Sequence, residues 1–148
     1  MSAEVQGLRH YRRAMLYLEQ DRRADAAAAA RAIVELAFAP LADALREHIR
    51  TVAADLQEGV ERVRVNLDKV PAMRNAEEET KRLIVAILQG GFAEECRTRG
   101  RGFWRRRAVE KRARVFVEMV REAADRHQDE TIDAAVRETA IRFLEVDR

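Results

Sequence analysis

The segment from residue 97 to residue 114, RTRGRGFWRRRAVEKRAR, concentrates residue types that bind phosphates and nucleobases. Guanidinium groups donate paired hydrogen bonds to phosphate oxygens, glycines let a backbone approach closely, and exposed aromatic rings stack on bases. The segment therefore predicts a nucleic-acid-binding surface. Its members are Arg97, Arg99, Arg101, Phe103, Trp104, Arg105, Arg106, Arg107, Lys111, Arg112 and Arg114.

The charge of this segment contrasts with the rest of the chain. Nine basic residues and one acid, Glu110, give the segment a net charge of +8. The chain has 28 basic and 26 acidic residues, so 19 bases and 25 acids lie elsewhere and carry −6. Such asymmetry is typical of a binding surface. In the alternative interpretation, the arginines pair with acids of this chain or of an acidic partner, and Phe103 and Trp104 anchor a helix in the core.

No other residues form a pattern that indicates catalysis or metal binding. The single cysteine, Cys96, cannot close a disulfide within the chain or build a multi-thiolate metal site. The three histidines, His10, His48 and His127, are scattered, and none has a carboxylate three residues before it, as di-iron helix bundles do. We therefore expect no catalytic residues, no metal and no cofactor.

One histidine has a suggestive context. The string from His48 to Thr51, His-Ile-Arg-Thr, resembles the phospho-accepting helix of histidine kinases, in which Arg-Thr-Pro follows a helical histidine. Val52 stands where that proline is expected, and Ile49 stands where an acid usually follows the histidine. The resemblance implies a phosphotransfer bundle in which His48 is phosphorylated.

The elements that position these residues are predicted from apolar spacing. Residues 3–20 form one helical face, and a second helix follows a polar break, with Asp25 as its cap. The two faces consist of Leu8, Tyr11, Met15 and Leu18, and of Ala26, Ala30, Ile33 and Ala37. Small alanine side chains predict a tight helix contact, either inside the fold or across a dimer. Pro40 predicts a corner, either where a new helix starts or as a kink in a continuous helix.

A long helix is predicted from Leu41 to Val70. Its apolar residues recur every eleven positions, which indicates a straight or slightly right-handed rod of about 45 Å. They are Leu41, Leu45, Ile49, Val52, Leu56, Val60, Val63, Leu67 and Val70. Pro71 disfavours helix at the residue before it and should end the rod.

Three further helices are predicted in the second half of the chain. Asn75 with Glu78 forms a capping-box pattern that should start a helix, which Gly90 and Gly91 should kink or break. Gly100 and Gly102 predict the next stop. A helix from residue 103 to 127 follows, and Asp129 should cap a last helix. The face of the 103–127 helix consists of Val109, Ala113, Phe116, Val120 and Ala124.

These patterns predict an all-α fold, a compact bundle of five to six helices with one helix of about 30 residues, in a single domain over residues 1–148. Hydrophobic residues at 47%, with 6 Gly and 2 Pro, exclude a disordered chain. No apolar run reaches the roughly 20 residues of a membrane span. We expect a cytoplasmic protein that binds no membrane.

The function expected from the sequence is a non-enzymatic module that binds RNA or single-stranded DNA. Its size and helical character are similar to those of small helical subunits of CRISPR effector complexes, which predicts a place in a larger ribonucleoprotein assembly. The alternative is a homo-oligomeric helical scaffold or adaptor that docks acidic partner proteins, with the alanine face and the long stripe as helix interfaces.

Overall fold

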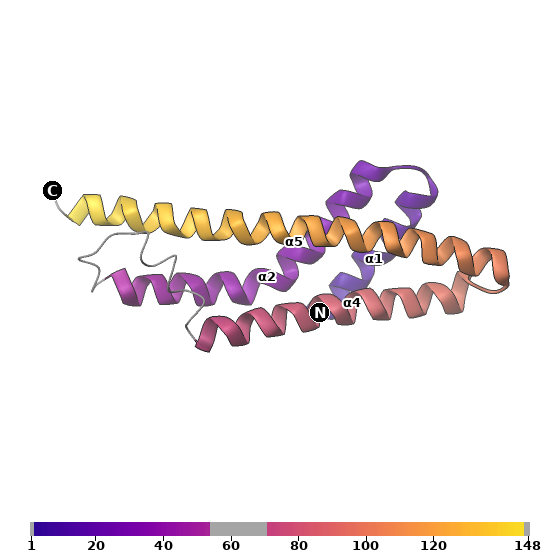
Figure 1. Ribbon diagram of the computed structural model, residues 1–148, viewed down its shortest axis with the longest axis horizontal. Helices are drawn as coiled ribbons and strands as arrows, with labels where there is room; N and C mark the ends of the chain where they lie inside the picture. Colours follow the sequence, from indigo (N-terminus) through magenta and orange to yellow (C-terminus); the bar gives the residue numbers. More distant parts are fainter. Residues whose placement is uncertain (1, 54–70, 147–148) are drawn as a thin grey trace. The chain divides into compact units, whose positions relative to one another are not determined.

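The computed structural model describes residues 2–53 and 71–146, with the side chains from 2–44, of Glu47 and from 75–130. These ranges contain four helices and no strand: α1 (Ala3–Glu19), α2 (Arg23–Ala53), α4 (Pro71–Arg99) and α5 (Phe103–Val146) (Figure 1). The all-α prediction is confirmed. The predicted five to six helices and the predicted 30-residue helix are not confirmed, because Leu41 lies inside α2 and residues 54–70 lie outside the described ranges.

Several predicted helix boundaries are wrong. α4 continues through Gly90 and Gly91, and α5 continues past Asp129, whereas α2 contains Pro40 within one continuous helix, which was one of the two alternatives for this proline. Each of these residues weakens a helix locally, but packing of an apolar face decides most helical stability in proteins. α4 begins at Pro71, before Asn75, because proline is pre-organised for the first helical position and loses no hydrogen bond there.

The chain divides into two compact units. The first contains residues 1–37 and 81–125, and the second contains residues 38–80 and 126–148. Three helices thus contribute to both units. That the whole chain forms one domain stays a prediction.

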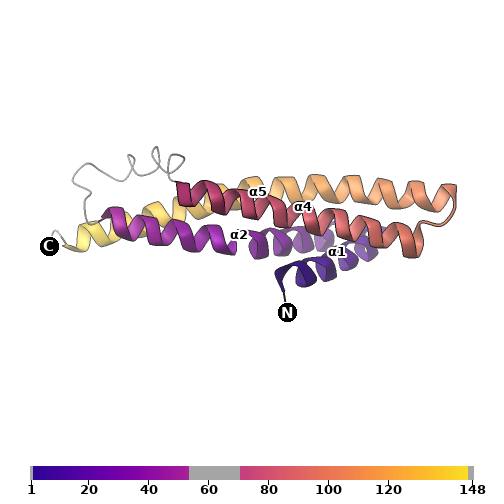
Figure 2. The same cartoon turned by 90° about the horizontal axis from the view of Figure 1, so that it is seen from below.

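In the first unit, α1 and the beginning of α2 form a helical hairpin, and α4 and α5 run antiparallel beside it (Figures 1 and 2). Each helix contributes buried apolar side chains to one core, and the predicted faces of α1, α2 and α5 are the ones buried. The largest fully buried side chains are Tyr11, Met15, Ile33, Val34, Ile87, Val109 and Phe116. Burying one such apolar side chain stabilises the fold by roughly 1.5–3 kcal/mol.

Two helix contacts in this core depend on small residues. A Cβ atom at Gly91 would overlap the ring of Tyr11, so α4 and α1 approach as closely as they do only because this residue is glycine. On α2, Ala26, Ala30 and Ala37 are buried. The alanine face therefore packs inside the chain, and the dimer interpretation of that face is wrong.

The second unit has a small described core. Phe38 and Leu41 of α2 and Ala76 and Thr80 of α4 are buried. The Phe38 ring also contacts the ring of His127 on α5, edge to face, with centroids 5.3 Å apart. Leu41, the first residue of the predicted eleven-residue repeat, is thus a core residue.

Candidate nucleic-acid interface

The loop between α4 and α5 places the two aromatic residues of the basic segment at a helix start. The Gly100 amide donates to the Cys96 carbonyl at 3.1 Å and ends α4, and the Gly102 carbonyl accepts from the Arg106 amide at 3.0 Å and begins α5. Gly102 has φ +93°, a conformation that side-chain-bearing residues rarely adopt. The prediction that Gly100 and Gly102 interrupt the helix is confirmed.

Both aromatic side chains at this start lie in solvent. Phe103 is 66% exposed and Trp104 is 76% exposed, more than any other large hydrophobic residue of the described part of the chain. Their rings contact each other edge to face, with centroids 5.1 Å apart and planes at 79°. The interpretation that Phe103 and Trp104 anchor the helix in the core is therefore wrong.

Arginines surround this aromatic pair. The guanidinium of Arg107 lies 5.6 Å from the Phe103 ring centroid, in cation–π geometry. Arg101 and Arg105, which flank the pair in sequence, are exposed and have no hydrogen bond or ion pair with another described residue. Among the described side chains, no cation lies over the Trp104 ring. We call Arg101, Phe103, Trp104, Arg105 and Arg107 the tip surface.

The helix start adds positive potential to the tip surface. The first turn of α5 contains no acidic residue, and its N-cap, Gly102, has no side chain to accept a backbone amide. In contrast, α1 has the Ser2 hydroxyl accepting from the Val5 amide at 3.3 Å and Glu4 in its first turn. The amino-terminal end of a helix dipole is positive, so cationic side chains placed there are unfavourable. Of the three consecutive arginines here, only Arg106 has an acidic partner in the described part of the chain, so Arg105 and Arg107 give the fold no ion pair.

Three of the predicted residues are instead paired within the fold. Arg99 donates to Glu19 of α1 at 3.0 Å, and Arg112 lies 3.6 Å from the same carboxylate. Arg106 pairs with Glu110 at 3.3 Å, and its guanidinium lies 5.4 Å from the centroid of the Phe92 ring. The prediction that arginines pair with acids elsewhere in the chain therefore holds for Arg99 and Arg112, whereas Arg106 pairs with the one acid of the basic segment itself.

The other predicted bases are exposed and unpaired among the residues that the structure describes. Two of them, Lys111 and Arg114, lie on α5 beyond the tip surface, and Arg97 lies in the last turn of α4. At 100° per residue, Lys111 follows Trp104 on nearly the same side of α5, and Arg107 and Arg114 share an adjacent side. The unpaired cations therefore extend from the tip surface along about two turns of one helix.

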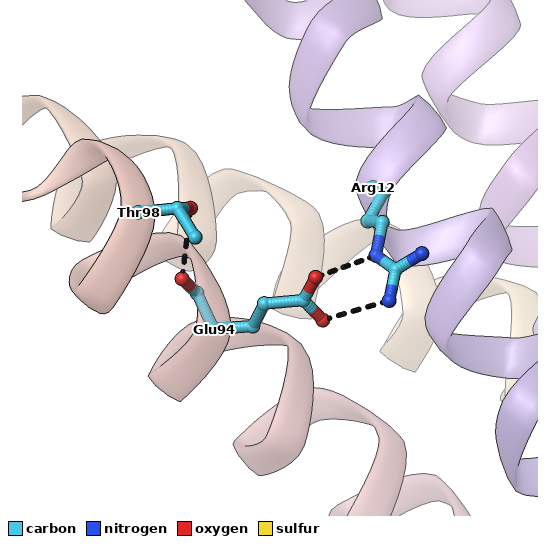
Figure 3. A network of polar contacts seen from close by, with 3 residues as sticks. All are labelled: Arg12, Glu94 and Thr98. Carbon is cyan, nitrogen blue, oxygen red and sulfur yellow. Dashed lines mark hydrogen bonds and ion pairs between the residues drawn. The ribbon is translucent and has the colours of Figure 1, made fainter.

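A second ion pair holds α1 on α4 near this end of the first unit. The Arg12 guanidinium makes a two-pronged contact with the Glu94 carboxylate, with Nε 2.7 Å from Oε1 and a terminal nitrogen 3.1 Å from Oε2 (Figure 3). The Thr98 hydroxyl donates to the Glu94 carbonyl at 2.9 Å, as Figure 3 also shows. These contacts fix the last turns of α4, from which the tip surface projects.

The structure also contains a buried polar cluster that the sequence did not reveal. Glu95 on α4 is 5% exposed, and the Glu95 Oε2, the Tyr11 hydroxyl and the Arg112 Nε are buried without a hydrogen-bond partner. Burial raises the pKa of Glu95, against the attraction of Arg99 and Arg112. Burial and the nearby Glu95 also raise the pKa of Tyr11. Glu94 and Glu95 are adjacent in sequence, and the sequence gives no sign of which of the two carboxylates is buried.

The remaining residues considered for chemistry are metal-ligand clusters, the cysteine and His48. In the part of the chain with described side chains, no three His, Cys, Asp or Glu residues lie together as metal ligands would. Cys96 is free and half-buried. His48 lies within α2, but its side chain lies outside the described ones, so phosphotransfer at His48 stays a prediction.

Comparison with known proteins adds no assignment: no protein-family model, curated protein or solved structure matches this chain. Within the described helices, none is both long and apolar enough to cross a membrane. The interpretation of the tip surface therefore depends on its geometry alone.

Proposed function

We propose that this chain is a nucleic-acid-binding module that contacts phosphates through unpaired arginines and stacks a base on Trp104. The observation that carries the proposal is the exposure of Trp104, 76%, between arginines that no acid among the described residues neutralises. The exposed indole adds no stability to the core, so its face is available to stack on a ligand.

The ligand chemistry follows from the side chains. Unpaired guanidinium groups bind phosphate oxygens in a forked geometry and release counterions from the nucleic acid. An aromatic face adds about 1–3 kcal/mol per stacked base without sequence preference. The proposed ligand is therefore RNA or single-stranded DNA, bound with little sequence specificity.

The proposed binding set is smaller than the eleven residues of the basic segment. Arg99, Arg106 and Arg112 have acidic partners within the fold, so we assign them to its stability. The proposed phosphate contacts come from Arg97, Arg101, Arg105, Arg107, Lys111 and Arg114. Membership in a larger ribonucleoprotein assembly stays a prediction that rests on size and helical character.

The test is fluorescence anisotropy of labelled 20-nucleotide single strands and duplexes with the full chain, at 50 and 200 mM salt. If about four phosphates are contacted, single-strand affinity should fall about 50-fold between these salt concentrations. The triple variant Arg101→Glu, Arg105→Glu, Arg107→Glu should lose binding at both.

The matched control changes three exposed arginines on other helix faces, Arg9→Glu, Arg13→Glu and Arg31→Glu, and therefore has the same net charge as the tip variant. It should keep most of the single-strand affinity. Equal losses of affinity in the two triple variants would show that binding depends on net charge alone. Absence of binding at 50 mM salt would reject the proposal. An acidic protein partner would then be the next ligand to test.

A further inference from the structure

A hollow of about 360 Å³ lies beside the tip surface, in the first unit. One wall comes from the end of α1 and the turn that follows it, and the other comes from the second to fourth turns of α5. Its lining includes Leu18, Ala108 and Val115 as apolar residues. A volume near 300 Å³ is at the lower end of small-molecule sites, so the hollow suits one small planar group.

The hollow continues the face of α5 that presents Trp104. Ala108, Lys111 and Val115 follow Trp104 by four, seven and eleven residues, the spacing that keeps side chains on one side of a helix. At about 1.5 Å per residue, the hollow begins about 6 Å from Trp104 along the helix axis. A strand whose base rests on Trp104 would therefore reach the hollow with its next residues.

The polar lining of the hollow offers both donors and acceptors. Arg23 and Lys111 are exposed cations and Asp21 is an exposed acid, and none of these side chains has a partner within the described part of the chain. Glu19 also lines the hollow, although its carboxylate already binds Arg99 and Arg112. With Arg112 the lining has three cations and two acids, and a base edge, unlike an inorganic anion, presents donors and acceptors to both kinds of group. The lining fits a nucleobase better than an inorganic anion.

We propose that the hollow receives a nucleobase of an unpaired strand whose neighbouring base stacks on Trp104. The proposal rests on the proposed function and names its substrate class. In a duplex, the faces of both bases are covered by their neighbours and their edges are paired. Only an unpaired strand can place one base on Trp104 and its neighbour between Leu18 and Val115, while Arg105 and Lys111 contact the phosphate between them.

The test fills the hollow without changing charge. Ala108→Leu adds three carbons at a half-buried helical position that lines the hollow, and Ala93→Leu makes the same change at an exposed position of α4 as a matched control. Affinity for a labelled single-stranded hexanucleotide should fall about 5- to 20-fold in Ala108→Leu and stay unchanged in Ala93→Leu. The salt dependence should be the same in both, because the phosphate contacts are kept.

Trp104 supplies a separate readout, because it is the only tryptophan in the chain. Its fluorescence should be quenched by the single strand in the parent chain and in Ala108→Leu, and much less by a blunt duplex of equal length. Val115→Phe, a second filling variant, guards against a folding defect in the first, and circular dichroism should show that both are as helical as the parent.

The outcomes separate the two proposals. Equal hexanucleotide affinity in the parent and in both filling variants would overturn the hollow proposal while the tip variant could still lose binding. Quenching by the duplex as strong as by the single strand would also overturn it, because it would place a paired end on Trp104. Absence of binding to any oligonucleotide would reject the proposed function and this inference together.

Discussion

Two aromatic pairs of this protein have nearly the same geometry and opposite surroundings. Tyr11 and Phe116 meet edge to face, with centroids 5.4 Å apart and planes at 83°, and they are 1% and 0% exposed. Phe103 and Trp104 meet at 5.1 Å and 79°, and they are mostly exposed. Burial, and not the contact between the rings, therefore distinguishes the two pairs.

The comparison separates stability from function. The buried pair joins α1 to α5 across the core and removes two large apolar surfaces from water. The exposed pair joins residues adjacent in sequence and holds no two helices together. An edge-to-face contact adds about 0.5–1.5 kcal/mol beyond burial, which is a small part of what a buried ring contributes. Residues of the first pair should therefore control unfolding, and those of the second pair should control binding.

The largest expected effect is on the buried pair. Phe116→Ala should lower the free energy of unfolding by about 3–5 kcal/mol, because it removes a ring from a core that can close only in part. Trp104→Ala should change it by less than about 0.5 kcal/mol, as surface substitutions usually do. Urea unfolding followed by circular dichroism measures both. A loss above 1 kcal/mol in Trp104→Ala would show that the tip surface also serves the fold.

Two adjacent glycines sharpen the comparison on α4. Gly91→Ala should lower the free energy of unfolding by about 2–3 kcal/mol, because its Cβ would overlap the buried ring of Tyr11 and force it to move. Gly90→Ala is the control, since its Cβ would meet only the Leu8 side chain, at 3.3 Å.

At position 90 the better helix propensity of alanine should leave stability unchanged or raise it by up to about 1 kcal/mol. Thermal unfolding of the two variants side by side would show the contrast. Similar losses at both positions would mean that the Tyr11 ring can shift at little cost.

The buried carboxylate gives the next effect, which depends on pH. Glu95 has a raised pKa in the folded state, so the fold is favoured below its unfolded value of 4.5 and loses that contribution as pH rises through the folded value. Glu95→Gln should remove this pH-dependent loss of stability, because the glutamine amide does not ionise. The charged and titratable groups around it are Tyr11, Glu19, Glu94, Arg99 and Arg112.

The variant should therefore gain stability relative to the parent as pH rises from 4 to 8. Urea titrations at pH 4, 6 and 8 would measure the difference. A difference that is constant with pH, or one that reverses and favours the parent at pH 8, would show that Arg99 and Arg112 outweigh the cost of burial.

The smallest expected effect is at the exposed margin of the core. The Arg12–Glu94 pair should contribute about 0.5–1 kcal/mol, because its geometry is two-pronged but Arg12 is half-exposed. A double-mutant cycle with Arg12→Met and Glu94→Gln isolates this coupling. It should shrink in 1 M salt. A coupling energy above 2 kcal/mol would show that this pair stabilises the fold as strongly as buried core residues do.

The sequence predicted the faces of the first unit better than its boundaries. The apolar stripes containing Tyr11, Ile33 and Phe116 are the buried ones, because a period of 3.6 residues defines a helix face whatever packs on it. Gly90 and Asp129 failed as boundaries, because each disfavours a helix by an amount that tertiary packing can exceed. Gly100 and Gly102 succeeded, since two glycines and the left-handed backbone at Gly102 act together.

The candidate site was predicted in its composition and incompletely in its geometry. The sequence placed all the tip-surface residues in one segment, and the signal that could have separated Arg106 from Arg105 is the acid four residues after Arg106. That separation depends on Glu110, one helical turn after Arg106, and for Arg99 and Arg112 it depends on Glu19, which is about 80 residues or more away in the chain.

The sequence by itself determined that the chain is helical, which faces of α1, α2 and α5 are apolar, and that a strong positive charge gathers around residues 97–114. These properties are local, since they follow from periodicity and composition. Only the tertiary structure decided that Trp104 is outside, that Glu95 is inside, and that Arg99 and Arg112 are paired with Glu19. Those properties depend on which helices become neighbours, because burial and ion pairing join residues that are distant in the chain.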